Sequence, residues 1–178
     1  MITNKLHQFI RESVKRIQRY ADRFWYPPFI GFLSILDNLI MIIPNDGILI
    51  SSSMMVPRRW HTFAVSVAIG NTIGALIVTK LAEHQGLPWV IEMYSGISDT
   101  QMWTWALKFF EQYGLILVFG IGVTPFMQQP VLIFAGLALI PFYKLAAVIF
   151  LSRLIKFIAM AYIGTHAPKL LNKLWGDK

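Results

Sequence analysis

A chain of 178 residues with 56% hydrophobic residues is more apolar than the roughly 45–50% usual for soluble domains, which favours a membrane protein and excludes a large soluble domain. The absence of cysteine excludes disulfides, thiolate metal sites, palmitoylation and a cysteine nucleophile. The net charge of +7 predicts an anionic partner. Because the cations flank apolar runs, that partner is expected to be acidic lipid, and nucleic acid is not expected.

Residues 1–28 are predicted to form a basic amphipathic helix that lies on the membrane surface. Apolar side chains recur along it at helical spacing, and the opposite face is basic. The cations of that face are Lys5, Arg11, Lys15, Arg16, Arg19 and Arg23. Anionic lipid is the expected partner, since each such cation contributes on the order of 1 kcal/mol near an acidic surface. The alternative is a solvated helix that packs on a neighbouring chain.

The next segment is predicted to form a re-entrant hairpin. The apolar runs 29–43 and 47–56 are each shorter than the roughly 20 residues that a transmembrane helix needs. A polar turn that begins with Pro44 and continues through Asn45 and Asp46 separates them. Two short runs joined by such a turn are typical of a hairpin that lines a protein or water-filled cavity.

Residues 62–79 carry no charge and predict the first full transmembrane helix. Within it, Gly70 and Gly74 have the spacing of a close helix contact. The hairpin and this helix together make a first repeat, residues 29–82. A polar connector, residues 83–113, follows it, and its later part has the pattern of a second amphipathic helix at the interface.

The second half of the chain has the same pattern as the first. Two short apolar runs, 114–123 and 131–140, flank a turn that contains Pro125 and Pro130, and residues 145–163 predict the second full transmembrane helix. The sequence patterns of the two halves align when Pro57 is placed over Pro141.

We therefore expect an all-α membrane protein in which two re-entrant hairpins and two transmembrane helices form an inverted repeat. The membrane domain is residues 29–164, the second repeat is residues 114–164, and residues 165–178 are a basic cytoplasmic tail. Basic residues accumulate in the N-terminal segment, in the Pro57 turn and in this tail, whereas the connector is acidic. Both termini are therefore predicted to be cytoplasmic, because Lys and Arg gather on that side. The hairpins then enter from opposite sides, and their tips approach near the midplane.

Several short motifs resemble the DedA superfamily, also described as VTT-domain or SNARE-associated membrane proteins, and in particular its small YqaA-like branch. The residues that carry the resemblance are Pro44 before a polar turn, AIGNTIG at 68–74, FFEQYG at 109–114, the turn with Pro125, the pair Ala135 and Gly136, and Arg153 in the closing helix. The resemblance implies two facing re-entrant hairpins in a bacterial inner membrane. It also implies movement of lipids such as undecaprenyl phosphate or phospholipids between leaflets.

The chain departs from that family at the second hairpin. Many members place an arginine near this proline turn, but residues 124–129 hold no cation, so a phosphate-binding role is not carried to it. Asp37 and Asp46 are counterparts of the acidic residues in the first hairpin, without the usual spacing. Arg153 approximates the cation of the last helix, and Lys156 lies one turn further on.

Four charged residues, Asp37, Asp46, Arg153 and Lys156, are expected to face a polar interior. A charge near the bilayer centre costs about 2.5–3.5 kcal/mol on insertion scales, so it normally faces a partner or a wet cavity. Arg153 and Lys156 are predicted to receive a lipid phosphate while Asp37 or Asp46 exchanges a proton. The alternative is a buried ion pair that is purely structural.

The hairpin tips offer further binding groups in Asn45, Gln128 and Gln129, beside the unpaired backbone groups of broken helices. The alternative is that each amide caps its own hairpin. The four histidines lack metal-ligand spacing, and no catalytic or nucleotide-binding motif occurs. The sequence therefore predicts a protein that binds no metal or cofactor and has no enzymatic activity.

The expected function is a lipid transporter of the flippase or scramblase type, with phosphate-bearing lipid as the partner and protons as a candidate coupling ion. One alternative is a proton-coupled carrier of small solutes or ions that uses the same carboxylates. Another is a non-transporting scaffold that holds a partner at the membrane through its N-terminal helix. The pattern is compatible with a homo-oligomer and does not fix the oligomeric state.

Overall fold

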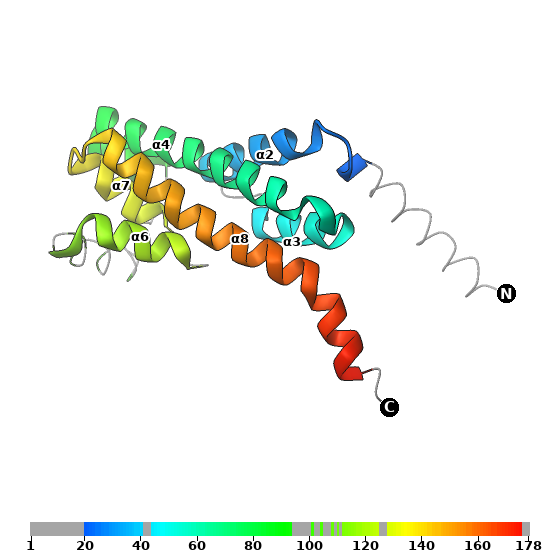
Figure 1. Cartoon of the computed structure of the whole chain (residues 1–178). Helices are drawn as coiled ribbons and strands as arrows, with labels where there is room; N and C mark the ends of the chain where they lie inside the picture. The colour runs from blue at the N-terminus through cyan, green and yellow to red at the C-terminus, as the bar shows by residue number, and fades with distance from the viewer. Residues whose placement is uncertain are drawn as a thin grey trace.

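The computed structural model describes residues 20–40, 44–93, 112–124 and 128–175, together with residues 101, 104, 108 and 110. All regular structure in this described part is helical, so the predicted all-α class is confirmed. Figure 1 shows two long helices, α4 (Trp60–Met93) and α8 (Phe142–Trp175), which lie side by side and run in opposite directions. Most of the predicted N-terminal amphipathic helix and much of the connector lie outside the described residues.

The first half begins with two short helices, α2 (Tyr26–Ile40) and α3 (Asn45–Met55). Two prolines, Pro27 and Pro28, lie in the first turn of α2, where the missing N–H groups cost no intrahelical hydrogen bond. At 1.5 Å per residue, α2 and α3 are about 22 and 16 Å long, well short of a hydrocarbon core of roughly 30 Å. Neither helix can cross a bilayer alone.

The second half also begins with two short helices, α6 (Leu115–Val123) and α7 (Gln129–Leu137). Each is about 14 Å long by the same rise per residue. Gly114 precedes α6 with φ 48°, a left-handed conformation that glycine adopts without steric cost. The order of two short helices and one long helix therefore occurs in both halves of the chain.

Two segments are long and apolar enough to cross a membrane, namely Pro57–Gly86, which includes most of α4, and Phe142–His166 in α8. Both are longer than the sequence predicts. The first continues past residue 82 and ends at Gly86, where φ 71° and ψ −171° break the helix before it resumes to Met93. The helix α8 continues through the predicted tail as far as Trp175.

The halves exchange their short helices. In each half the first short helix packs on the long helix of its own half, α2 on α4 and α6 on α8. The second short helix packs on the long helix of the other half, α3 on α8 and α7 on α4. The long helices α4 and α8 also contact each other. The chain is thus one packed unit in which each half is completed by the other.

The contact between α2 and α4 is close because glycines lie in it. A Cβ atom at Gly70 would lie 1.9 Å from the carbonyl oxygen of Gly31, and one at Gly74 would lie 2.8 Å from the carbonyl oxygen of Ile35. Real Cβ atoms do not approach other atoms so closely, and the obstructing atoms belong to backbone, apart from the Cβ of Asn38, which would lie 2.8 Å from a Cβ at Gly74. Gly70 and Gly74 therefore allow the α2 backbone to lie directly against α4.

The core is divided between the two ends of the long helices. A first hydrophobic cluster joins α2, α3 and the beginning of α4 to the later part of α8, and includes Val67 and Phe157. A second cluster joins α6, α7 and the middle of α4 to the beginning of α8, and includes Ala75 and Ile149. Buried polar residues lie between the two clusters. Asn71 on α4 and Arg153 on α8, for example, are each four residues from a member of either cluster. Polar side chains therefore lie in the middle of the bundle.

Candidate functional site

Four ionisable residues predicted to share an interior, Asp37, Asp46, Arg153 and Lys156, lie close together, and we call them the central charge cluster. The Nζ atom of Lys156 on α8 lies 2.9 Å from Oδ2 of Asp46 in the first turn of α3. Both carboxylates are near enough to act electrostatically on Arg153 and Lys156. We call the contacting helix pair α2 and α3 the first hairpin, and the pair α6 and α7 the second hairpin. The charges therefore come from the first hairpin and from α8, which are far apart in the sequence.

Arg153 is the most buried of the four, with only 3% of its surface exposed. Its Nη1 atom donates a long hydrogen bond of 3.4 Å to the carbonyl oxygen of Gly122. Gly122 lies in the last turn of α6, where carbonyl groups have no intrahelical partner and the helix dipole is negative. The Nε atom of Arg153 has no hydrogen-bond partner among the described residues. One cation thus contacts the end of the second hairpin's first helix and still has an unused donor.

Asn45 ties together the two helices of the first hairpin. Its Nδ2 atom donates a hydrogen bond of 2.7 Å to Oδ2 of Asp37 and one of 3.3 Å to Oγ of Ser34, and both of these residues lie on α2. Asn45 is buried at the first position of α3. The amide therefore bonds within its own hairpin while it holds Asp37 in the central charge cluster.

The second hairpin contributes less to the cluster than the sequence predicts. Gln128 is buried and Gln129 half-buried at the start of α7. Within the described part of the chain, neither side chain forms a hydrogen bond with the central charge cluster. The link to this hairpin is instead the carbonyl oxygen of Gly122, a backbone group that residue identity does not reveal.

The three prolines predicted to form the hairpin turns differ in position. Pro44 precedes α3 and is exposed, in agreement with a turn. Pro130 lies in the first turn of α7 and is buried, so it begins the helix that follows the turn. Pro125 lies outside the described residues.

Other polar residues of the site were not singled out by sequence reasoning. Ser34 donates a hydrogen bond of 3.2 Å to the carbonyl oxygen of Val67 and so links α2 to α4. Asn38 donates a hydrogen bond of 3.1 Å to the carbonyl oxygen of Ser34. Asn71 is 4% exposed on α4, and its Oδ1 atom has no hydrogen-bond partner among the described residues. A signal was present, since each is a polar residue inside an apolar run.

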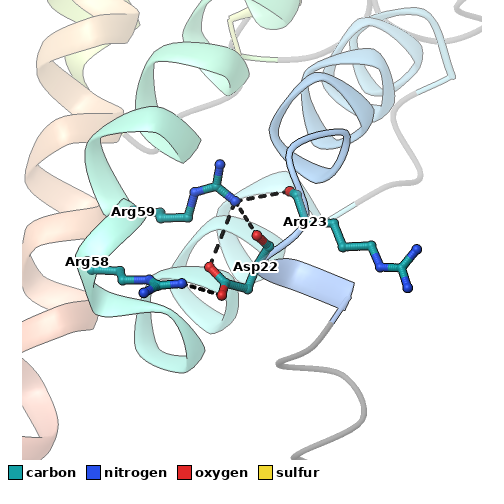
Figure 2. A network of polar contacts seen from close by, with 4 residues as sticks. All are labelled: Asp22, Arg23, Arg58 and Arg59. Carbon is teal, nitrogen blue, oxygen red and sulfur yellow. Dashed lines mark hydrogen bonds and ion pairs between the residues drawn. The ribbon is translucent and has the colours of Figure 1, made fainter.

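A second charge network lies at the start of α4, apart from the central charge cluster. Figure 2 shows Asp22, just before α2, between Arg58 and Arg59 of the 3-10 turn Pro57–Arg59. Arg58 donates to the Asp22 carboxylate, and Arg59 donates to the backbone oxygens of Asp22 and Arg23. The hydrogen bond from Arg58, followed by the positive charges of both arginines, lowers the pKa of the Asp22 carboxyl from 3.8. This network fastens the chain before α2 to the turn between α3 and α4.

Comparison with known proteins finds relatives without an assigned function. An uncharacterized protein of Haemophilus influenzae is 29% identical over 141 residues, which cover 79% of this chain and 71% of the relative. A protein of Histophilus somni, named an uncharacterized HI0703 homolog, is 25% identical over 151 residues, which cover 85% of this chain and 76% of the relative. No family model and no solved structure matches the chain.

Proposed function

We propose that this chain is an integral membrane protein that passes a phosphate-bearing lipid from one leaflet of a bilayer to the other. One observation carries the proposal. The cations Arg153 and Lys156 lie near the midpoint of Phe142–His166, a segment apolar enough to cross a membrane, and carboxylates of another helix pair lie beside them. Since each charge at such depth costs about 2.5–3.5 kcal/mol, their retention in one cluster is explained best by a polar substrate.

The packing of the short helices supports a transport fold. If the segments Pro57–Gly86 and Phe142–His166 cross the membrane, the short helices on either side of each break act as re-entrant hairpins. The opposite directions of α4 and α8 (Figure 1) and the exchange of α3 and α7 between halves fit an inverted repeat. In such a repeat, both hairpin tips meet at the middle, where Asp46 and Gly122 approach α8.

The geometry suggests how a lipid phosphate would bind. Arg153 and Lys156 are three residues apart on α8, so both can point to one anion. In this structure Lys156 is paired with Asp46. A phosphate that replaces Asp46 as the partner of Lys156 would release this carboxylate from its ion pair. A proton exchanged there would couple lipid movement to proton movement.

We infer the location from the charged ends of the helices. Arg58 and Arg59 lie at the start of α4, and further cations accumulate before residue 24. Lys and Arg are retained on the cytoplasmic side of membrane proteins. This supports an orientation with both termini in the cytoplasm, and we propose a bacterial inner membrane as the location. Reporter fusions at the two ends and in the connector test the orientation, because only the connector fusion is expected outside.

The function is tested with purified protein in liposomes that carry a fluorescent phospholipid and receive a membrane-impermeant quencher. The proposal predicts quenching beyond the outer-leaflet fraction, at a rate above that of protein-free liposomes. Arg153→Ala should reduce this rate to near the protein-free value. Lys144→Gln is the matched control, because it removes an exposed cation from the same helix, and its rate should equal that of the wild type.

Other outcomes identify the other function classes. If Arg153→Ala lowers thermal stability and leaves the lipid rate intact, the central charge cluster is structural. A protein that moves protons or small ions across the vesicle membrane but leaves lipid in place is a solute carrier. A scaffold would move neither, and it would lose its function in cells when residues 1–28 are removed.

A further inference from the structure

Asn71 and Arg153 share a property that the central charge cluster does not explain. Both are buried beyond nine-tenths, at 4% and 3% exposure, and each has a polar side-chain atom without a hydrogen-bond partner among the described residues. The atom of Asn71 is Oδ1, an acceptor, and the atom of Arg153 is Nε, a donor. Since most buried polar atoms in folded proteins are paired, each unpaired one calls for a physical explanation.

The register of the two long helices places these residues at the same level. The rings of Trp60 and Tyr162 are 5.9 Å apart near one end of the contact, and Nζ of Lys80 lies 5.9 Å from the Phe142 ring centroid near the other. In each pair the residue numbers add to the same sum, as in an antiparallel pair of helices. The same register puts Asn71 opposite residue 151, two residues and thus about 3 Å along the axis from Arg153.

The two residues also face the same interior. On α8, Arg153 is four residues from Ile149 of the second cluster and four from Phe157 of the first. On α4, Asn71 lies four residues from Ala75 of the second cluster and four from Val67 of the first. Residues four apart lie on one face of a helix. Asn71 and Arg153 therefore form one polar layer between the two apolar clusters.

We propose that this polar layer recognises a lipid head group that carries both an anionic oxygen and a hydrogen-bond donor. Arg153 Nε donates to the phosphate oxygen, while Asn71 Oδ1 accepts from a hydroxyl group of the same head group. The proposal rests on the proposed function and deepens it, because it makes Asn71 a specificity-determining residue and narrows the substrate class to hydroxyl-bearing phospholipids. A site built to pair a hydroxyl rejects the analogue that lacks it, since its own buried polar group then stays unpaired.

Two lipids of equal charge test this assignment. Phosphatidylglycerol and phosphatidylethanol are both singly charged phosphodiesters, and only the first has head-group hydroxyls. In liposomes with acyl-labelled forms of each, wild-type protein should move phosphatidylglycerol at least about fivefold faster, as expected for one net hydrogen bond. The proposal is overturned if wild-type protein moves both lipids at the same rate and binds them equally.

Asn71→Leu removes the acceptor. This variant should move phosphatidylglycerol as slowly as it moves phosphatidylethanol, so the ratio of the two rates falls from at least about five to about one. Its melting temperature should not fall, because the substitution removes a buried atom that has no partner in the resting structure. A structural asparagine predicts the opposite, namely a lower melting temperature and equal loss for both lipids.

Thr72→Val is the matched control, on the same turn of α4. Thr72 is also buried, but its hydroxyl group already donates a hydrogen bond of 2.7 Å to the carbonyl oxygen of Ala68 in its own helix. This variant should keep the wild-type preference for phosphatidylglycerol. Loss of the preference in Thr72→Val would show that any polar residue at this depth has the same effect, and would overturn the assignment to Asn71.

Binding separates failure of this inference from failure of the proposed function. Native mass spectrometry of detergent-solubilised protein measures occupancy by the two lipids without transport. Preferential binding of phosphatidylglycerol that is lost in Asn71→Leu, in a protein that transports neither lipid, supports the polar layer and refutes the transporter. Transport of both lipids at equal rates, with equal binding, supports the transporter and refutes the assignment to Asn71.

Discussion

Lys156 and Asp46 form an ion pair of 2.9 Å between α8 and the first turn of α3, and the two partners differ in burial. The Lys156 side chain is 10% exposed, whereas that of Asp46 is 38% exposed. Loss of either partner therefore has a different consequence for the one that remains. A cation left alone among apolar side chains is costly, whereas a carboxylate with more than a third of its surface exposed can be solvated.

Asp46→Asn should accordingly destabilise the protein more than Lys156→Met does. We expect Asp46→Asn to lower the free energy of unfolding by about 1.5–3 kcal/mol, in the range for hydrogen bonds to charged groups. The loss for Lys156→Met should be smaller, because methionine puts another long apolar side chain in the same mostly buried position. Thermal unfolding in detergent, followed by tryptophan fluorescence, measures both, and the double variant gives the coupling between them. The opposite order of stabilities would contradict the burial that the structure assigns to the pair.

Gly70→Ala should destabilise the contact between α2 and α4. The added methyl group would lie 1.9 Å from the backbone oxygen of Gly31, which cannot move without the helix. Overpacking of this kind costs typically about 1–3 kcal/mol. Gly120→Ala is the matched control in α6, where a Cβ would meet no heavy atom of the described structure within 4 Å, and it should be neutral or stabilise by up to about 1 kcal/mol. Equal melting temperatures for the two variants would place α2 elsewhere.

Much of this arrangement could be predicted from sequence because charge in an apolar run is informative. Asp37, Arg153 and Lys156 stand out in such runs, Asp46 stands in the turn between two of them, and hydrocarbon requires these charges to share an interior. The helix breaks at Pro44 and Gly114 follow from backbone chemistry that is visible in the letters. These features depend on local composition, so one sequence suffices to find them.

The remaining features depend on packing between distant segments. Gly31 allows the close approach of Gly70, but α2 carries no spacing that marks it as the partner of α4. Gly122 binds Arg153 through its carbonyl group, which every residue has. Asn71 was part of a recognised motif, yet only the register of α4 on α8 brings it level with Arg153. Pairing of this kind is set by the fold and leaves no local pattern.

The network around Asp22 should stabilise the protein at neutral pH and lose this effect in acid. Arg58 and Arg59 lower the pKa of the Asp22 carboxyl from 3.8, so the folded protein binds its proton less readily than the unfolded chain. The contribution is therefore complete above that value and disappears as the pH falls through the lower folded-state pKa. The melting temperature of wild type minus that of Asp22→Asn should be constant from about pH 7 to about pH 5 and shrink below about pH 4.

Arg23→Gln provides the control for that network. Figure 2 shows its side chain directed away from Asp22, and Arg23 takes part through its backbone oxygen only. Its melting temperature should follow the wild type at every pH. A difference that grows in acid for Asp22→Asn, or one that appears equally in Arg23→Gln, would indicate a general charge effect of the basic N-terminal segment.

A disulfide between α3 and α8 should show whether α3 moves away from α8 during the proposed lipid transport. The chain has no cysteine, so a pair introduced at Ile50 and Gly164 has no competing thiol. A Cβ at Gly164 would lie 3.4 Å from Cα of Ile50, which puts the two Cα atoms at most about 5 Å apart, within the range of disulfides. We expect oxidation to remove both free thiols from labelling, whereas each single variant stays reactive.

If the chain transports lipid as proposed, cross-linking should lower the transport rate at least about tenfold, and reductant should restore it. The reason is that Asp46 lies at the start of α3 and covers Lys156, so a phosphate reaches this cation only when the first turn of α3 leaves α8. Reduced double variant and oxidised single variants are the controls for the substitutions themselves. Undiminished transport by fully cross-linked protein would mean that α3 stays on α8 throughout, and the lipid would then have to reach Arg153 from the side of α6.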